Sequence, residues 1–238
     1  MHASHGVELN CGCQTCSQKD KGFFCGLTLA AAKDLEAIKS PSIYPTGAVL
    51  FMEKESYRGV YLLCSGKVKL TMTSSGGKTL ILRLARPGEL LGLMSAMSSS
   101  PYEATVETLE PSQVCFIRQE DFSQFIAKYP EVYRSVLRQV SAQYYDTCEQ
   151  MRTIALSTSS REKVARLLLH WSAAGRETEE GTRTSVPFTH EQIAECVGST
   201  RETVTRTLSE FKNNHLVTFK GATMLIPDRA ALAAIGGD

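Results

Sequence analysis

Four cysteines lie close together near the start of the 238-residue chain, at Cys11, Cys13, Cys16 and Cys25. Thiolates are ligands for zinc and for iron–sulfur clusters, and they are also readily oxidised. Structural disulfides are rare in a reducing compartment, where clustered thiols more often serve metal or redox chemistry. The N-terminal segment is therefore the first candidate for a chemically active site.

A second group of side chains, near the C-terminus, has the types that read DNA bases. Residues 189–208 predict two short helices joined by a tight turn. Thr189 is a good N-cap with Gln192 as its capping-box partner, Gly198 can adopt the positive φ of the turn, and Thr200 caps the second helix. This pattern favours a helix-turn-helix.

On the second helix, spacing separates a buried face from an exposed one. Val204, Leu208 and Phe211 are expected to face inward, with Ala194 small enough for the helices to cross closely. The exposed face at the start of that helix carries Arg201, Glu202, Thr205 and Arg206. Arginine can donate two hydrogen bonds to guanine, and glutamate can accept one from cytosine. The predicted DNA contacts are completed by Thr189, Ser199, Lys212 and Lys220, the two lysines as phosphate contacts.

Two short helices around a glycine also occur in proteins that do not bind DNA, and exposed Arg and Glu are often only surface. Residues 199–221 contain four Lys or Arg against two Asp or Glu, a local excess of positive charge. The net charge of the whole chain is only +1, which argues neither for nor against nucleic acid. Residues 216–219 and 223–226 predict a small hairpin wing after the second helix.

The elements before this motif follow two different periods. Short apolar runs broken by Gly, Pro and Ser predict strands at 48–52, 60–64, 67–72, 79–84, 105–109 and 113–117. Many short strands at this spacing are typical of an antiparallel barrel or jelly roll. A helix is expected at 29–38 before them, another at 161–172, and a loop over 175–185.

From about Glu120 the pattern becomes helical, and apolar residues then recur with a heptad period. This stripe consists of Tyr133, Leu137, Val140, Tyr144, Thr147, Met151 and Ile154. A stripe of this kind suits a helix that packs against its own copy, and the alternative is a helix that lies on the barrel. Its length favours dimerisation.

Bulk composition is that of an ordinary globular protein, with 42% hydrophobic and 21% charged residues. No apolar run reaches the roughly 18–20 residues that cross a bilayer, and no secretory signal is visible. We therefore expect a cytoplasmic protein without a membrane partner.

Over nearly its whole length the sequence resembles the CRP/FNR superfamily of bacterial regulators. The resemblance is carried by YPTGAVLF at 44–51, CSGKVK at 64–69, RPGELLG at 86–92 and, most specifically, GSTRETVTR at 198–206. It implies an α+β fold with a cyclic-nucleotide-binding-type β-roll, a long dimerisation helix and a C-terminal winged helix-turn-helix. The corresponding domains are a Cys-rich segment (1–27), the β-roll (28–130), the dimerisation helix and hinge (131–158) and the DNA-binding domain (159–238).

The resemblance also implies partners. Arg201, Glu202 and Arg206 match the family's base-reading positions, which suggests a homodimer on palindromic double-stranded DNA with a TGA-containing half-site. Thr205 falls where subfamilies differ, so the outer bases stay open. Bound at a promoter, such a dimer would recruit or block RNA polymerase.

The class of effector can be predicted from the residues at positions that bind effectors in other members of the family. Where the cyclic-AMP branch has its ribose- and phosphate-binding residues, this chain has Leu93, Tyr102 and Glu103, which cannot neutralise a cyclic phosphate. The iron–sulfur branch is similar in its cysteines, and the resemblance implies a [4Fe–4S] cluster on Cys13, Cys16, Cys25 and Cys115, with Cys11 as a substitute for Cys13. The eight residues between Cys16 and Cys25 depart from the best-known members.

Other readings of the sensor stay open. They are a thiol switch or a zinc site on the N-terminal cysteines, and a metal-free β-roll that binds a small molecule or haem. Cys64, Cys148 and Cys196 are interpreted as small buried hydrophobic residues. An enzyme or electron carrier is disfavoured because the sequence has no phosphate loop and no Ser-His-Asp-like grouping. We expect a regulator that answers oxygen, nitric oxide or redox state.

Overall fold

The computed structural model describes residues 27–173, 175–186 and 188–237, and its contacts divide the chain into two units. One unit contains the residues up to Met72 together with Arg83–Tyr145, and the other contains Thr73–Leu82 and the residues from Asp146 onward. The division falls within the long helix α4 (Glu131–Leu156). Each unit has its own hydrophobic core.

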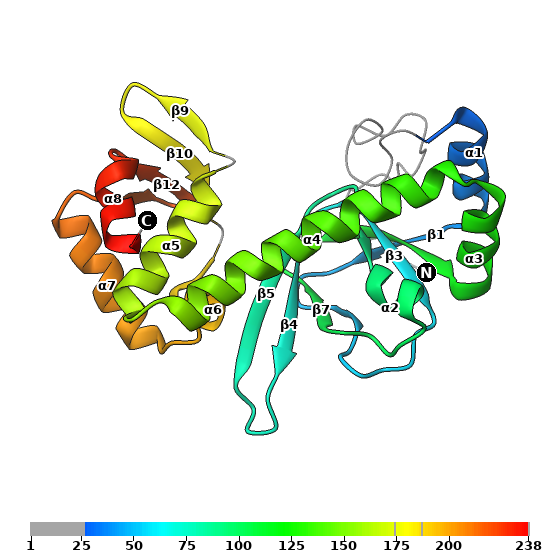
Figure 1. Ribbon diagram of the computed structural model, residues 1–238, viewed down its shortest axis with the longest axis horizontal. Coiled ribbons are helices and arrows are strands. Elements are labelled where there is room, and N and C mark those ends of the chain that lie inside the picture. Colours follow the sequence, from blue (N-terminus) through cyan, green and yellow to red (C-terminus); the bar gives the residue numbers. More distant parts are fainter. Residues whose placement is uncertain (1–26, 174, 187, 238) are drawn as a thin grey trace. The chain divides into compact units, whose positions relative to one another are not determined.

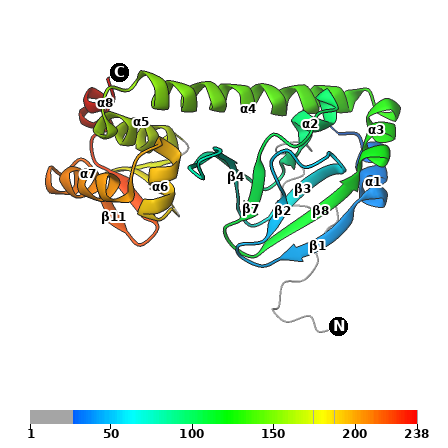
Figure 2. The ribbon, with the colours of Figure 1, turned by 90° about the horizontal axis from the view of Figure 1, so that it is seen from below.

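The first unit is a roll of short antiparallel strands with helices at its ends (Figure 1). The elements before α4 are α1 (Leu29–Ile38), β1 (Ser40–Tyr44), β2 (Val49–Phe51), β3 (Gly59–Ser65), β4 (Val68–Thr73), β5 (Thr79–Ala85), β6 (Leu90–Leu91), α2 (Leu93–Ser98), β7 (Thr105–Thr108), β8 (Ser112–Arg118) and α3 (Gln119–Lys128). All of them belong to the first unit except the end of β4 at Thr73 and residues 79–82 of β5, which the contacts group with the second unit. One sheet has the order β1-β8-β3-β6 and the other the order β2-β7-β4-β5. Figure 2 shows β1, β8 and β3 side by side. The predicted β-roll is confirmed.

Strand β3 shows how the roll separates its two faces. Successive side chains of a strand point to opposite sides. Val60 and Leu62 enter a core shared with α1, α3 and the first turns of α4. Tyr61 points the other way, where its ring lies 5.3 Å from that of Phe51 and 4.8 Å from that of Phe116, measured between centroids. Aliphatic Val60 and Leu62 therefore lie on one face of β3, and Tyr61 with its aromatic neighbours lies on the other.

The second unit is a small helical domain with one sheet. Besides the end of α4 it contains α5 (Ser160–Ser172), β9 (Arg176–Thr178), β10 (Gly181–Ser185), α6 (His190–Val197), α7 (Arg201–Asn213), β11 (Thr218–Lys220), β12 (Thr223–Ile226) and α8 (Arg229–Gly236). The sheet has the order β11-β12-β10-β9. Val164 and Leu168 of α5 pack with the apolar faces of α6 and α7 in its core. The predicted helix-turn-helix and the hairpin wing are confirmed.

One sequence-based expectation is wrong, because residues 175–185 form the β9–β10 hairpin instead of a loop. These strands are short, and their charged and threonine side chains lack an apolar alternation. Thr182 is the only buried residue among Arg176–Thr178 and Gly181–Ser185. Pairing of β10 with β12 supplies the stability that the local sequence does not signal. Elements β1, β6, α2 and α8 were also not predicted.

Candidate DNA interface and sensor site

The first helix of the candidate DNA interface, α6, begins at a complete capping box. The Thr189 hydroxyl accepts a hydrogen bond from the Gln192 amide at 3.2 Å, and the Gln192 side chain accepts one from the Thr189 amide at 2.9 Å. These bonds satisfy backbone donors that a helix start would otherwise leave unpaired. The start of α6 is therefore determined locally.

The turn between the two helices depends on Gly198, whose φ is +65°. A side chain there would meet no atom within 4 Å, so the requirement for glycine comes from the backbone conformation and not from space. Thr200 then caps α7, with its hydroxyl accepting from the Thr203 amide at 3.3 Å. The turn sets the direction in which α7 leaves α6.

Helix α7 has one buried and one exposed face. Val204, Leu208 and Phe211 are buried in the core, as predicted. The side chains of the opposite face are exposed: Arg201, Glu202, Thr205 and Arg206. The helix therefore presents two guanidinium groups, a carboxylate and a hydroxyl to solvent along its first two turns.

His190 belongs to this surface and was not predicted. Its Nδ1 shares a hydrogen bond of 2.9 Å with the Thr205 hydroxyl, and both side chains are exposed. His190 is the first residue of α6, while Thr205 lies on α7. No sequence signal joins them, because only the crossing of the two helices brings them together.

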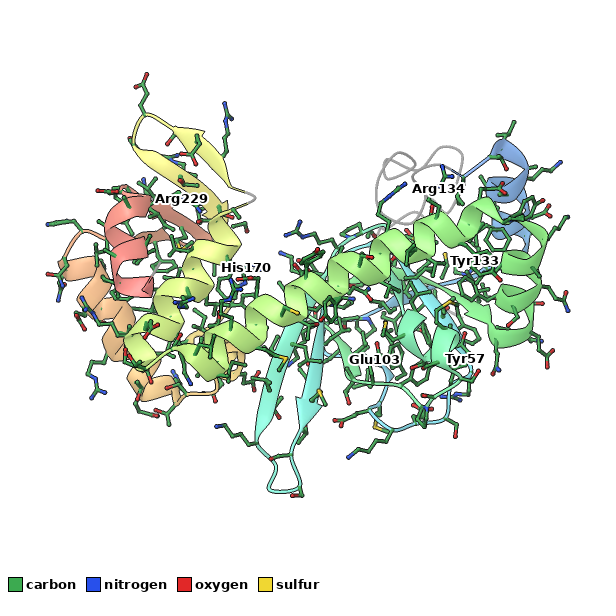
Figure 3. The ribbon with its side chains drawn as sticks, viewed as in Figure 1. Tyr57, Glu103, Tyr133, Arg134, His170 and Arg229 are labelled. Atoms are coloured by element: carbon green, nitrogen blue, oxygen red, sulfur yellow. The ribbon has the colours of Figure 1, made fainter. Side chains whose placement is uncertain are left out.

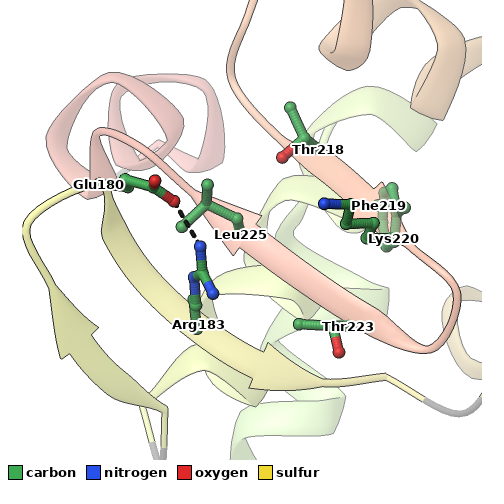
Figure 4. Close-up of a pocket in the computed structure, with 7 residues that line it drawn as sticks. All are labelled: Glu180, Arg183, Thr218, Phe219, Lys220, Thr223 and Leu225. Carbon is green, nitrogen blue, oxygen red and sulfur yellow. Dashed lines mark hydrogen bonds and ion pairs between the residues drawn. The ribbon is translucent and has the colours of Figure 1, made fainter.

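The remaining predicted DNA contacts differ in their exposure to solvent. Lys212 and Lys220 are exposed, and Ser199 is half-buried with its hydroxyl 3.2 Å from that of Ser160. Lys220 also borders a hollow on the sheet of the wing (Figure 4), where Arg183 forms an ion pair with Glu180. The hollow is lined by Glu180, Arg183, Thr218, Phe219, Lys220, Thr223 and Leu225.

The predicted dimerisation stripe lies mostly on the exposed side of α4. Leu137 and Tyr144 are each 67% exposed, and Tyr133 (labelled in Figure 3), Thr147 and Met151 are exposed as well. Val140 and Ile154 are half-buried. The other side of the helix is fastened to β6, because the Gln139 side chain donates to the Leu90 carbonyl at 2.7 Å and accepts from its amide at 3.0 Å. An apolar stripe is thus held facing outward.

Tyr102, at a position where the resemblance predicts a ligand phosphate, is packed inside the roll. Tyr102 is only 1% exposed, its ring stacks on Phe51 with centroids 3.9 Å apart, and its hydroxyl donates to the Gly59 carbonyl at 2.7 Å. Burial raises the pKa of this phenol. Glu103 accepts a hydrogen bond from the Ser95 hydroxyl at 2.9 Å, and Leu93 is buried. The two positions that the resemblance predicts to meet a cyclic phosphate are therefore a buried phenol and a carboxyl group.

Among the predicted metal ligands, only Cys115 lies within the described residues; Cys11, Cys13, Cys16 and Cys25 lie outside them. Cys115 is completely buried on β8. Its sulfur is 3.4 Å from that of Cys64 on β3. The interpretation of Cys64 as a small buried hydrophobic residue is confirmed only in part, because its side chain packs against the hydrophobic cluster but is half-buried. Cys196 is buried as expected, whereas Cys148 is half-buried. Within the described ranges, no three His, Cys, Asp or Glu side chains are grouped to hold a metal ion.

Taken together, a β-roll, a long helix with an outward apolar stripe and a winged helix-turn-helix define a signal-responsive DNA-binding protein. The family model of the cyclic nucleotide-binding domain matches residues 42–129, and that of the Crp-like helix-turn-helix domain matches residues 162–235. The chain belongs to the CRP/FNR superfamily of transcriptional regulators, and is a DNA-binding transcription factor rather than an enzyme. No helix in the described part of the chain is long and apolar enough to span a membrane.

The relatives do not resolve the branch of this superfamily. The chain is 27% identical over 213 residues to the CRP-like cAMP-activated global transcriptional regulator of Mycobacterium tuberculosis, which covers 89% of this chain and 95% of that protein. It is 28% identical over 194 residues to the transcriptional activator protein FnrA of Stutzerimonas stutzeri, which covers 80% of this chain and 78% of that protein. The structure of FixK2 from Bradyrhizobium japonicum superposes with a TM-score of 0.71 at 20% identity, over 83% of this chain and 97% of that one.

Proposed function

We propose that this protein acts as a homodimer that reads a palindromic site with TGA-containing half-sites through α7, and that its sensor responds to oxygen, nitric oxide or redox state. The observation that carries the DNA-reading proposal is the polar edge of α7. Arg201, Glu202 and Arg206 are exposed while the opposite face of the same helix is buried, so these side chains are available to base edges. In a dimer, two such helices would enter successive major grooves about one turn apart.

The test is DNA binding at stated salt concentrations by the neutral triple variant Arg201→Gln, Glu202→Gln and Arg206→Gln. Each good base contact is worth about 1–3 kcal/mol of discrimination, so the variant is expected to lose most of its preference for a TGA palindrome over scrambled DNA. Arg118→Gln, which removes an exposed arginine of the first unit, is the matched control and should bind normally. Unchanged sequence preference in the triple variant would refute the assignment of these residues.

For the sensor, we propose a [4Fe–4S] cluster held by Cys115 with Cys16, Cys25 and Cys13, or Cys11 in place of Cys13. Cys115 fits as one ligand, because it offers a soft sulfur donor within an apolar cluster, and burial of that kind tunes iron–sulfur centres. When bound, such a cluster supplies redox chemistry that the side chains lack. We propose oxygen or nitric oxide as the signals.

The surroundings of Cys115 support a coupling to dimerisation. Cys115 shares its hydrophobic cluster with Val132 and Val136 of α4, and Val140 of the stripe packs against the same cluster. Closely packed cores transmit changes of side-chain position, so a displaced Cys115 would shift the first turns of α4. The dimer and its paired recognition helices would follow, with RNA polymerase recruited or blocked at the promoter.

Iron and sulfide analysis of protein purified without oxygen tests the cluster. We expect about four irons per chain, a visible absorption band that air removes, and loss of both in Cys115→Ser. Cys196→Ser, which also changes a buried cysteine but of the second unit, should keep the iron. A metal-free wild type that still binds its operator would refute the cluster and favour the thiol or small-molecule alternatives.

Cyclic nucleotide is not the proposed effector. Tyr102 is buried against Phe51 and carries no positive charge, and Glu103 would repel a cyclic phosphate. Titration with cyclic AMP is expected to give no binding and no change in DNA affinity. Saturable binding at micromolar cyclic AMP would overturn this part of the proposal.

A further inference from the structure

Two cysteines that are far apart in the sequence meet on the sheet of the roll. Cys64 is near the end of β3 and Cys115 is in the middle of β8, and these strands are neighbours (Figure 2). Their sulfur atoms are 3.4 Å apart. A disulfide requires about 2.0 Å between the sulfurs, so the two thiols are in contact and must move closer before they can bond.

An irregularity in the strand pairing accounts for this approach. Leu62 pairs directly with Cys115, so in a regular ladder Cys64 would be only a diagonal neighbour, with its Cα about 7–8 Å away. That spacing is too long for most disulfides. The register shifts between Leu63 and Ser65, which is the position of Cys64. The bulge therefore aims Cys64 at Cys115.

The two thiols differ in their access to solvent. Cys64 is half-buried at the edge of the hydrophobic cluster, whereas Cys115 is completely buried within it. An oxidant from solution therefore reaches Cys64 before Cys115. This asymmetry suits a pair in which one thiol reacts first and the other resolves the product.

We propose that Cys64 and Cys115 form a peroxide-oxidisable dithiol site that closes to an intramolecular disulfide. The Cys64 thiolate attacks hydrogen peroxide, forming an S–O bond as the O–O bond breaks and hydroxide leaves. The Cys115 sulfur then attacks the Cys64 sulfenic acid, forming the S–S bond as water leaves. The two sulfurs together lose two electrons, and the peroxide gains them. The site needs none of the N-terminal cysteines and shares only Cys115 with the proposed cluster, so the disulfide forms in protein whose Cys115 sulfur is not bound to iron.

The test uses the full chain with Cys11, Cys13, Cys16 and Cys25 replaced by serine, which leaves four thiols. After one equivalent of hydrogen peroxide, denaturation and alkylation, mass spectrometry is expected to count two alkylated thiols instead of four. A reductant should restore all four. Peptide mapping should find Cys64 joined to Cys115 in a monomer on non-reducing gels.

Two further substitutions in that background separate the pair from general oxidation. Cys64→Ser should abolish the disulfide, whereas Cys148→Ser, at another half-buried cysteine, should leave it intact. Cys115→Val should also abolish it while keeping an apolar side chain in the core, and circular dichroism checks that each variant folds. Four alkylated thiols after peroxide, or a bond mapped to any other pair, would overturn the proposal. Loss of the iron site would not affect this result.

Discussion

At the scale of single residues, the hydroxyl of Thr205 depends on a neighbour that the recognition helix does not supply. His190 shares a 2.9 Å hydrogen bond with it from the start of α6. A hydroxyl held in one orientation presents a defined donor or acceptor to DNA, whereas a freely rotating one does not. Thr205 is among the base contacts that we propose, so its orientation would bear on which bases of the half-site are read.

We expect His190→Ala and Thr205→Val each to weaken operator binding by about 0.5–1.5 kcal/mol, the net value of one hydrogen bond. The double variant should lose little more than either single variant, since both changes remove the same interaction. Fluorescence anisotropy with labelled operator DNA measures the binding free energy of the wild type, the two single variants and the double variant, which form a double-mutant cycle. Fully additive losses would mean that the two residues act separately.

Gly198 allows a second prediction at this scale, because its surroundings are open. Gly198→Ala should destabilise the second unit by about 1–2 kcal/mol through backbone strain alone. Gly198→Asn should cost less, since asparagine tolerates positive φ better. Urea denaturation gives both values, and equal losses for the two variants would point to a cause other than backbone strain.

At the scale of elements, α1 is docked on α3 by an exposed polar contact. The Asp34 carboxylate accepts from the Lys128 ammonium at 2.5 Å and from the Tyr129 hydroxyl at 2.7 Å. The hydrogen bond from Lys128, followed by that from Tyr129, lowers the pKa of Asp34 below its usual value of 3.8. The contact therefore stabilises the folded state above that value and fades as the pH falls through the lowered pKa.

Asp34→Asn is accordingly expected to lower the melting temperature of the protein slightly at neutral pH. The difference from the wild type should stay constant between about pH 7 and pH 5, because Asp34 remains ionised there in both the folded and the unfolded state. Differential scanning calorimetry at several pH values measures it. A difference that shrinks already at pH 6 would contradict the direction of this pKa shift.

Helix α4 carries the prediction about assembly. Gln139 anchors one side of the helix to β6, and the apolar stripe faces away. Leu137→Glu places a charge in the middle of the proposed coiled-coil contact, so we expect the dimer to dissociate at least tenfold more readily. Light scattering during size-exclusion chromatography measures the molar mass and so distinguishes the dimer from the monomer.

The matched control for this variant is Ala142→Glu on the same helix. Ala142 is exposed but lies about 140° around the helix from Leu137, outside the stripe. The Ala142→Glu substitution should leave the dimer intact. Two equally monomeric variants would indicate that added charge, and not its position, disrupts assembly.

At the scale of the whole molecule, DNA binding depends on how many phosphates each dimer contacts. Lys212 and Lys220 are exposed and are proposed as phosphate contacts. Each lost phosphate contact lowers the slope of log affinity against log salt by about 0.9, so Lys212→Ala should lower it by roughly two in a dimer. Specific and scrambled DNA should be affected alike, because phosphates carry no sequence.

Lys54→Ala, which removes an exposed ammonium of the sensor unit, is the control for this measurement. Its salt slope should equal that of the wild type. A normal slope in Lys212→Ala would remove this lysine from the predicted contact set.

Local signals in the sequence determined the helix-turn-helix. The capping box at Thr189, the left-handed turn at Gly198 and the cap at Thr200 are interactions between residues at most four positions apart, so their spacing is visible in the chain itself. The buried and exposed faces of α7 follow from the helical period in the same way. The β-roll was predictable as a class because its strands are short, apolar and separated by turns.

Contacts between distant segments were decided only by the tertiary structure. The Cys64–Cys115 approach depends on strand register and one bulge, the His190–Thr205 bond on a helix crossing, and the packing of Tyr102 on Phe51 on closure of the roll. The β9–β10 hairpin owes its form to pairing with β12. These features have no local signature in the sequence, because each segment could pack against many others, and only the tertiary structure determines which one it contacts.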